Sequence, residues 1–257
     1  SEELAATPEA KLSILAEHEM QASAEMLVRL DGESKLSDSI VVASRFTQQT
    51  LIQNGIPAKK ITVLPYGVDI TKFPQKKYYK NKSVYLKILF LGQMVQRKGL
   101  SYLLEAIKTL KTKKVELTIV GRGRIDEPLL KEYGAFINLN IVRGLSHDAL
   151  VQCFHGHDVM VLPSLVEGFG HVILEAMSAG LPVICTKNTA GPDLFISGHE
   201  GLVVPIRDSD SIAMGIESFI RDKGKAEFMG RQAADTAREF TWERYSEGIK
   251  NFYLRNS

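Results

Sequence analysis

Apolar and polar positions along the chain follow two different patterns, and the longer one begins near residue 84. From there, short apolar runs alternate with segments whose apolar residues recur at helical spacing. The predicted strands lie at 87–91, 115–120, 139–142, 158–162, 182–185 and 202–204. The predicted helices lie near 99–110, 127–134, 146–155, 171–180, 191–196 and 208–222. This alternation predicts an α/β fold in which helices cover both faces of a doubly wound parallel sheet.

The pattern before residue 70 is shorter. One amphipathic helix is predicted over 9–30 from the spacing of Leu12, Leu15, Ala16, Met20, Ala24 and Leu27. Short strands are predicted at 39–43 and 61–64, with Ser44 as the cap of the helix between them and Gly55 as its stop. Two strands are too few for an independent sheet. We therefore expect a partial second α/β domain, the end of a domain whose earlier strands lie outside this sequence.

The run 71–83 between the two patterns is lysine-rich and lacks periodicity, which is typical of a linker. The expected organisation is thus a residual domain end at 1–70, this linker, and a complete Rossmann-like domain at 84–240. The segment 241–257 is expected to form a last helix that begins near Trp242.

Composition indicates an ordinary globular protein, with 44% hydrophobic and 24% charged residues. The net charge of +2 gives no basic excess of the kind that nucleic-acid binding needs. No apolar run approaches the roughly 18 residues of a membrane span. Cys153 and Cys185 form no disulfide framework, so we expect reduced thiols and a cytoplasmic protein. The lysine runs at 76–82 and 108–114 are either solvated faces or weak contacts with the inner face of a membrane.

The strongest chemical signal is P-S-L-V-E-G-F-G-H-V-I-L-E at 163–175, which follows a predicted buried strand and opens a helix. Ligands bind at such strand ends in doubly wound sheets. Gly168 and Gly170 allow the backbone to approach a ligand, and the free N–H groups of the helix suit a diphosphate without a metal. Glu167 and Glu175 supply acceptor oxygens for the hydroxyls of a ribose or hexose.

This motif resembles the signature of glycosyltransferase family 4, whose members are retaining enzymes of the GT-B fold. Further motifs carry the resemblance from about residue 38 onward. They are P-Y-G-V-D at 65–69, F-L-G-Q-M-V-Q-R-K-G at 90–99, I-V-G-R-G at 119–123, E-A-M-S-A-G-L-P-V-I at 175–184 and G-L-V-V-P at 201–205. The resemblance implies that 84–240 is the C-terminal, nucleotide-sugar-binding domain of such an enzyme.

The resemblance also implies roles for individual residues. Glu175 would bind the ribose hydroxyls of the donor, Glu167 would contact the transferred sugar, and Lys98 would neutralise the diphosphate. The loop around Gly168 and the helix start would receive the sugar and diphosphate through the backbone of Phe169, Gly170, His171 and Val172. The nucleobase would lie at Arg143, Gly144 and Leu145. We take Glu167 and Lys98 as the catalytic residues, with the leaving phosphate as the general base.

One position departs from the family pattern. Many members carry an arginine directly after the glycine that ends the first strand of the domain, and this chain has Gln93 there. Glutamine donates a hydrogen bond but supplies no charge. Two alternatives follow. Either Arg97, beside Lys98, supplies the missing charge at the diphosphate, or the affinity for the donor is lower than in family members with the arginine.

Other readings of the polar residues are weaker. A metal site is conceivable at His147, His155, His157 and Asp158. These residues belong to a helix and a strand and need not converge, so we expect no metal. Arg122 and Arg124 are either phosphate contacts or parts of a solvated turn, and the second is favoured. Cys185 is expected in the core. A dinucleotide-dependent oxidoreductase is excluded because G-Q-M-V-Q-R replaces the required G-x-G-x-x-G.

The resemblance thus implies transfer of a sugar from a UDP- or GDP-linked donor to an acceptor hydroxyl with retention. The implied acceptor is a saccharide or a lipid-linked molecule, and no cofactor is implied. The alternative is a non-catalytic module that binds the nucleotide sugar. We expect the chain alone to be close to inactive, because only one of the two domains is complete. Apolar positions on the helix at 9–30 favour a homodimer.

Overall fold

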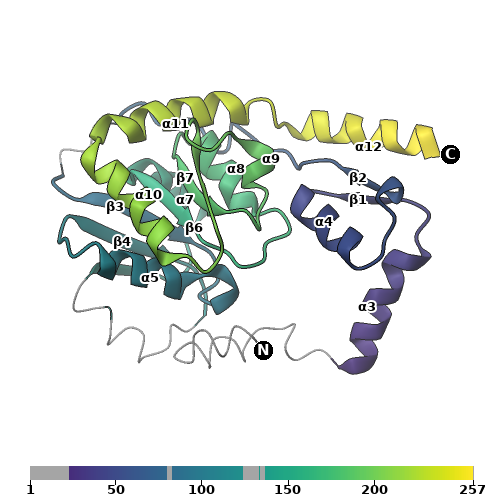
Figure 1. Ribbon diagram of the computed structural model, residues 1–257. Helices are drawn as coiled ribbons and strands as arrows, with labels where there is room; N and C mark the ends of the chain where they lie inside the picture. The colour runs from purple at the N-terminus through teal and green to yellow at the C-terminus, as the bar shows by residue number, and fades with distance from the viewer. Residues whose placement is uncertain (1–22, 80–82, 124–132, 134–136, 257) are drawn as a thin grey trace.

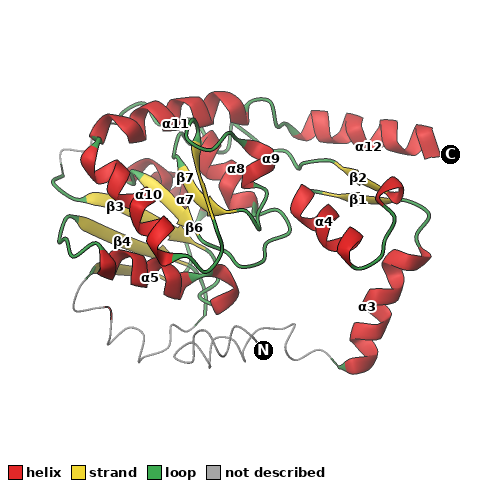
Figure 2. Ribbon diagram, viewed as in Figure 1, coloured by secondary structure: helices red, strands yellow, loops and turns green. Residues whose placement is uncertain are grey.

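The computed structural model describes residues 23–79, 83–123, 133 and 137–256. A large sheet with its helices forms one part, and a small sheet near the N-terminus forms the other (Figures 1 and 2). The large sheet holds β3 (Leu86–Leu91), β4 (Val115–Val120), β5 (Asn138–Val142), β6 (Val159–Leu162), β7 (Val183–Thr186) and β8 (Gly201–Val204). All of its neighbouring strands are parallel. The predicted strands agree with these bounds to within one residue at each end.

The strand order is β5-β4-β3-β6-β7-β8. The chain therefore runs outward from β3 to one edge and then crosses to β6 before it runs to the other edge. This is the Rossmann order, and β3 and β6 flank the point where the direction of winding reverses. Ligands of such sheets bind outside the carboxyl ends of these two strands.

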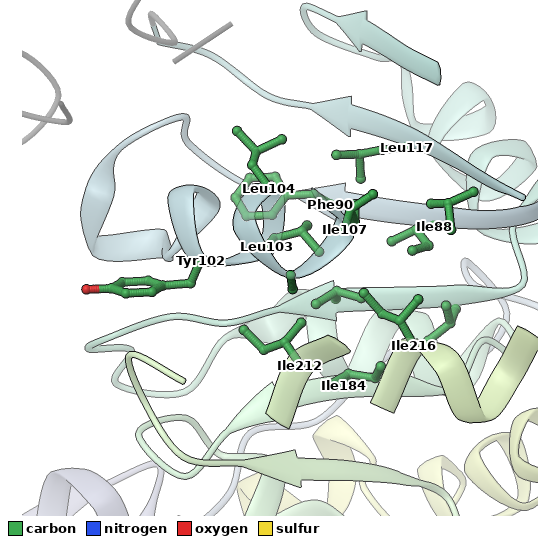
Figure 3. Close-up of a cluster of buried hydrophobic side chains, with 14 of the residues drawn as sticks. Ile88, Phe90, Tyr102, Leu103, Leu104, Ile107, Leu117, Ile184, Ile212 and Ile216 are labelled. Atoms are coloured by element: carbon green, nitrogen blue, oxygen red, sulfur yellow. The ribbon is translucent and has the colours of Figure 1, made fainter. Parts of the chain in front are cut away.

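The helices of the large part are α5 (Leu100–Thr109), α7 (His147–Gly156), α8 (His171–Ser178), α9 (Gly191–Leu194), α10 (Ser209–Arg221) and α11 (Lys223–Ala237). Alternate residues of each strand face opposite cores. Ile88 and Phe90 of β3 pack with α5 and α10 on one face, as Figure 3 shows, whereas Leu89 packs with α8 on the other. Complete burial on both faces explains the apolar sequence of β6 and of the first three residues of β7, which ends in the buried Thr186.

The small part consists of α3 (Ala24–Leu36), β1 (Ile40–Val42), α4 (Arg45–Gln53) and β2 (Ile61–Val63). β1 and β2 pair in parallel. The predicted cap and stop are confirmed, since the side chain of Ser44 accepts from the Thr47 N–H and Gly55 has a φ of 87°. The predicted end of the first helix at residue 30 is wrong, because α3 continues to Leu36 through Gly32. Residues 9–22 of that predicted helix, and with them most of the expected dimer contact, lie outside the described residues.

The last helix, α12 (Trp242–Asn256), begins where the sequence predicts. It lies over β1 and β2 in Figure 1, so the C-terminus returns to the small part. A Cβ atom on Gly248 would meet the Leu64 side chain at 3.1 Å, which shows how closely the helix packs after β2. The Val68 N–H also donates to the Phe240 carbonyl at 2.9 Å, a normal hydrogen-bond length.

The segment predicted as a linker is packed between α7 and α8. Ser178 of α8 donates to the Phe73 carbonyl at 2.7 Å, and Lys76 donates its Nζ proton to the His157 carbonyl at 2.8 Å. Lys76 is only 5% exposed, and burial lowers the pKa of its ammonium to about 8. Lys76 is therefore not available for the membrane contact considered for the run 76–82. In the described ranges, no helix is both long and apolar enough to cross a membrane.

Candidate active site

The candidate site lies at the carboxyl ends of β3 and β6, where two loops meet. The loop after β3 contains the 3-10 helix η4 (Gln96–Lys98), and the loop after β6 runs from 163 to 170. Gly99 has a φ of 73°, and a Cβ atom there would overlap the Pro163 carbonyl oxygen. The Leu165 N–H donates to the Arg97 carbonyl at 2.8 Å. Only a glycine at 99 allows the two loops to meet this closely.

The loop after β6 delivers the chain into α8 with an open helix end. Gly170, the N-cap residue, adopts the left-handed conformation with a φ of 80°, and no side chain caps the helix. An uncapped helix start presents N–H groups and the positive end of the helix dipole to a ligand. The sequence predicts an anion site at this helix start, at Gly168, Phe169, Gly170, His171 and Val172, and the structure places these five residues at the end of the loop and in the first turn of α8.

The two predicted catalytic residues are in contact. The Lys98 ammonium forms an ion pair with Oε2 of Glu167, and their side chains are 14% and 16% exposed. Arg97 approaches the same oxygen at 3.8 Å and donates from Nη1 to the Val166 carbonyl at 3.0 Å. The β3 loop thus directs two cations at the carboxylate of the β6 loop.

Glu175 lies in the second turn of α8 and is partly buried. Burial raises the pKa of its carboxyl group, and the nearby His147 lowers it. No described residue donates a hydrogen bond to this carboxylate. A partly buried carboxylate with a raised pKa, close to the switch point of the sheet, is a candidate ligand-binding group.

His147 is engaged elsewhere and does not form a metal site with the other candidates. Its Nε2 lies 2.9 Å from the Lys72 carbonyl, and Nε2 of His155 lies 2.7 Å from the Pro74 carbonyl. His157 pairs through Nδ1 with the Cys153 carbonyl. Among the residues that the structure describes, no group of three His, Cys, Asp or Glu is placed to hold a metal ion.

The remaining predicted residues line neighbouring strand ends. Gln93 is exposed next to Gly92, against which the Lys98 side chain lies. Arg143 and Gly144 are exposed after β5, where Leu145 packs partly into the core. Arg122 is exposed after β4, and Arg124 lies outside the described residues. Cys185 is fully buried, and burial raises the pKa of its thiol to about 12, which fits the expected core position.

An aromatic cluster adjoins the start of α8. The Tyr66 ring stacks on His171 with centroids 4.8 Å apart and planes 8° apart. The ring centroids of Trp242 in α12 and His171 are 5.9 Å apart, and Phe169 and Tyr245 complete the group around Tyr66. Burial lowers the pKa of His171, whereas Glu167 raises it. The sequence placed Tyr66 in the P-Y-G-V-D motif and Trp242 at a helix start, but no spacing indicated that they meet.

The small part also contacts the candidate site. The hydroxyls of Ser44 and Thr47, at the start of α4, both donate to the Gly168 carbonyl. Next to them, Arg45 donates its backbone N–H to Asp193 at 2.8 Å and pairs with it through Nε at 3.3 Å. The sequence predicted Ser44 only as a helix cap. Its second contact spans 124 residues, so no local pattern could reveal it.

The fold is that of a Rossmann-like α/β protein, and its candidate site at the switch point of the sheet combines an uncapped helix start, a cationic loop and two acidic side chains. Comparison with sequence families identifies it further. Residues 72–236 match the family described as glycosyl transferases group 1. The match covers more than half of the chain, and the chain belongs to this family.

Curated relatives agree with the family. The chain is 29% identical over 231 residues to an uncharacterized glycosyltransferase of Methanocaldococcus jannaschii, covering 83% of this chain and 59% of the relative. It is 26% identical to the capsular polysaccharide biosynthesis glycosyltransferase CapM of Staphylococcus aureus, covering 86% and 63%. The chain thus spans about three fifths of the length of these relatives.

Solved structures share the fold. A sucrose-phosphate synthase from Thermosynechococcus elongatus superimposes with a TM-score of 0.78 at 23% identity, covering 93% of this chain and 63% of the other. The Anabaena protein HepE, solved in complex with UDP and glucose, superimposes with a TM-score of 0.73 at 20% identity, covering 86% and 64%.

Proposed function

We propose that the chain is the donor-binding half of a retaining glycosyltransferase that transfers a sugar from a nucleotide diphosphate sugar to an acceptor hydroxyl. The observation that carries this proposal is the meeting of Lys98, Glu167 and the uncapped start of α8 at the switch point of the sheet. A cation and a helix start together suit the diphosphate, and a carboxylate suits sugar hydroxyls. HepE, which shares the fold, is solved with UDP and with UDP-glucose, and this supports a UDP-linked donor.

In this proposal the residues act by position and charge. Lys98 and the N–H groups of α8 stabilise the negative charge that develops on the leaving diphosphate. Glu167 holds the transferred sugar near its reacting face, and Glu175 accepts hydrogen bonds from the ribose hydroxyls. The nucleobase lies against Arg143, Gly144 and Leu145. The leaving phosphate accepts the proton of the acceptor hydroxyl, and no cofactor or metal ion takes part.

The proposed acceptor is a saccharide or a lipid-linked molecule. Two relatives support this choice by name, CapM of Staphylococcus aureus and a phosphatidylinositol monomannoside mannosyltransferase of Mycobacterium tuberculosis, which is 27% identical. A lipid-linked acceptor would place the protein at the inner face of a membrane. The lysines in the run 108–114 would then be candidate contacts.

Calorimetry tests the donor assignment. We expect UDP or GDP to bind in a buffer that contains a chelator, whereas CMP, which lacks the second phosphate, binds more weakly. Loss of nucleoside diphosphate binding on chelation would contradict the metal-independent site. A transfer assay with the nucleotide sugar of the preferred base, performed on the two-domain enzyme of which the chain is proposed to be the donor-binding half, then separates an enzyme from a non-catalytic binding module. A module binds the donor without releasing nucleoside diphosphate.

Glu175→Gln is expected to change stability and donor binding in opposite directions. The raised pKa means that ionisation of Glu175 costs folding free energy, so stability falls as pH rises through this pKa. The glutamine variant should therefore melt at a higher temperature than the parent near pH 8, and the difference should vanish near pH 4. Donor affinity should fall about tenfold, because neutral hydrogen bonds to the ribose replace charge-assisted ones.

Thermal melting at the two pH values and calorimetry with the nucleoside diphosphate check this prediction. Glu217→Gln is the matched control, since Glu217 pairs with Arg221 on the surface of α10. Unchanged nucleotide affinity in the Glu175 variant would remove the ribose assignment.

Gln93→Arg is expected to tighten binding of the nucleoside diphosphate. An added guanidinium beside the partly shielded phosphates should contribute about 1 kcal/mol, roughly fivefold in affinity. The comparison is with Gln53→Arg, which adds the same charge at the far end of α4. If affinity stays level or falls in the Gln93 variant, Arg97 already supplies the charge at the diphosphate.

A further inference from the structure

Glu167 occupies the cationic centre of the candidate site. Its Oε2 atom forms the ion pair with the Lys98 ammonium and lies 3.8 Å from Nη1 of Arg97. All three side chains are mostly shielded from solvent, at 16%, 14% and 26% exposure. Water and salt screen a shielded ion pair less than a surface pair, so the attraction between these charges persists at physiological salt.

The same side chain also lies at the start of α8. A Cβ atom on Gly170 would stand 3.1 Å from Cγ of Glu167, so the side chain crosses directly over the N-cap residue. The charge of Glu167 is felt by His171, the first residue of the helix. The backbone fixes the origin of the side chain, since the Glu167 N–H donates to the Asn188 carbonyl at 3.0 Å. The Glu167 side chain therefore lies beside the helix start as well as at Lys98.

We propose that Glu167 is an internal competitor of the diphosphate, and that it makes the site prefer a sugar-bearing donor over the bare nucleoside diphosphate. This inference rests on the donor site proposed above. A diphosphate that pairs with Lys98 must displace the Glu167 carboxylate. A nucleotide sugar offers the displaced carboxylate new hydrogen bonds from its sugar hydroxyls. A bare nucleoside diphosphate leaves it shielded and next to the phosphates, with only the longer contact to Arg97 at 3.8 Å.

A shielded carboxylate that has lost Lys98 and lies beside the like charge of the phosphates costs free energy, and this cost disfavours binding of the bare diphosphate. The same exchange helps the reaction to complete its cycle. After transfer the sugar hydroxyls are gone, and Glu167 returns to Lys98 and weakens the hold on the product. Release of the nucleoside diphosphate is thereby coupled to departure of the sugar.

Glu167→Gln tests the inference, because it removes the competing charge and keeps the shape of the side chain. Calorimetry is performed with UDP, UDP-glucose, GDP and GDP-mannose in a buffer with chelator and without phosphate or sulfate. We expect the variant to bind the matching nucleoside diphosphate about tenfold more tightly than the parent, because Lys98 then pairs with the phosphate without first giving up a charge pair with the carboxylate. The matching nucleotide sugar should gain less or lose affinity, so that the preference for the sugar-bearing form shrinks.

Two further variants separate this effect from its alternatives. Glu217→Gln changes the net charge equally on the surface of α10 and should leave both affinities unchanged. Lys98→Gln added to Glu167→Gln should remove most of the gain, because the contested cation is then absent. Melting temperatures establish that each variant is folded.

The outcomes distinguish the inference from the function on which it rests. Nucleoside diphosphate affinity that is equal or weaker in folded Glu167→Gln, with clear binding by the parent, would overturn the competitor role and leave the donor site intact. A gain of the same size in Glu217→Gln would also overturn it, as an effect of net charge. If neither nucleoside diphosphates nor nucleotide sugars bind to the parent or any variant, the proposed donor site itself is wrong.

Discussion

Replacing Lys98 with alanine is expected to lower kcat/KM for donor turnover by about 10²–10³-fold, the usual loss when one preorganised charge-stabilising group is removed. Two causes act together. The ammonium that would stabilise the leaving diphosphate is gone. The Glu167 carboxylate also loses its ion pair with Lys98 and faces the phosphates with only the longer contact to Arg97. The effect should appear in transfer to an acceptor and in slow hydrolysis of the donor alike. Release of nucleoside diphosphate from the nucleotide sugar measures both, in the two-domain enzyme of which the chain is proposed to be the donor-binding half.

Lys108→Ala is the matched control. Lys108 lies near the other end of α5, where it pairs with Glu105 at 3.9 Å. Loss of this surface lysine should leave turnover within about twofold of the parent, because exposed pairs contribute little. Comparable turnover in the Lys98 and Lys108 variants would show that Lys98 takes no part in charge stabilisation.

Gly121→Ala is expected to destabilise the protein by about 3 kcal/mol, at the upper end of the cost of overpacking. A Cβ atom at this position would overlap the carbonyl oxygen of Gly92. Gly121 follows β4 and Gly92 follows β3, and their backbones are tied to the neighbouring strands at 3.0 Å each. Neither backbone can yield without opening the sheet beside the candidate site. For a domain of this size the melting temperature should fall by roughly 6–12 °C.

Gly156→Ala serves as the control for this substitution. Gly156 ends α7, and a Cβ atom there meets nothing within 4 Å. Alanine is favoured over glycine in a helix by about 1 kcal/mol, so this variant should melt at the parental temperature or slightly above it. If the Gly121→Ala and Gly156→Ala variants have the same melting temperature, the close contact of the β3 and β4 loops is not rigid.

The large sheet is predictable because its strands are short, apolar and buried. Val159–Leu162 and Val183–Thr186 are buried at every position, so their apolar runs mark them without any knowledge of their neighbours. The site could be located for a related reason. Gly99 and Gly170 both adopt conformations with positive φ at strand or helix ends, and glycine at such places signals a close approach of the backbone.

Contacts between distant segments could not be predicted in this way. The packing of the segment around Lys76 depends on a carbonyl of His157, and nothing in its lysine-rich composition distinguishes a buried lysine from a solvated one. The end of α3 was misplaced because the apolar spacing fades before the helix ends. Its cap geometry at Ser37, where the backbone N–H donates to Glu33, sets the end instead.

The stack of Tyr66, His171 and Trp242 has a spectroscopic consequence. Trp242 is the single tryptophan of the chain, and it is 41% exposed beside the start of α8. Its indole emission therefore comes from one known place. This place adjoins the loop after β2, the last helix and the proposed binding site of the diphosphate. The protein thus carries a built-in optical probe at the junction of its two parts. Changes in wavelength or intensity of that emission would report events at this junction without any chemical label.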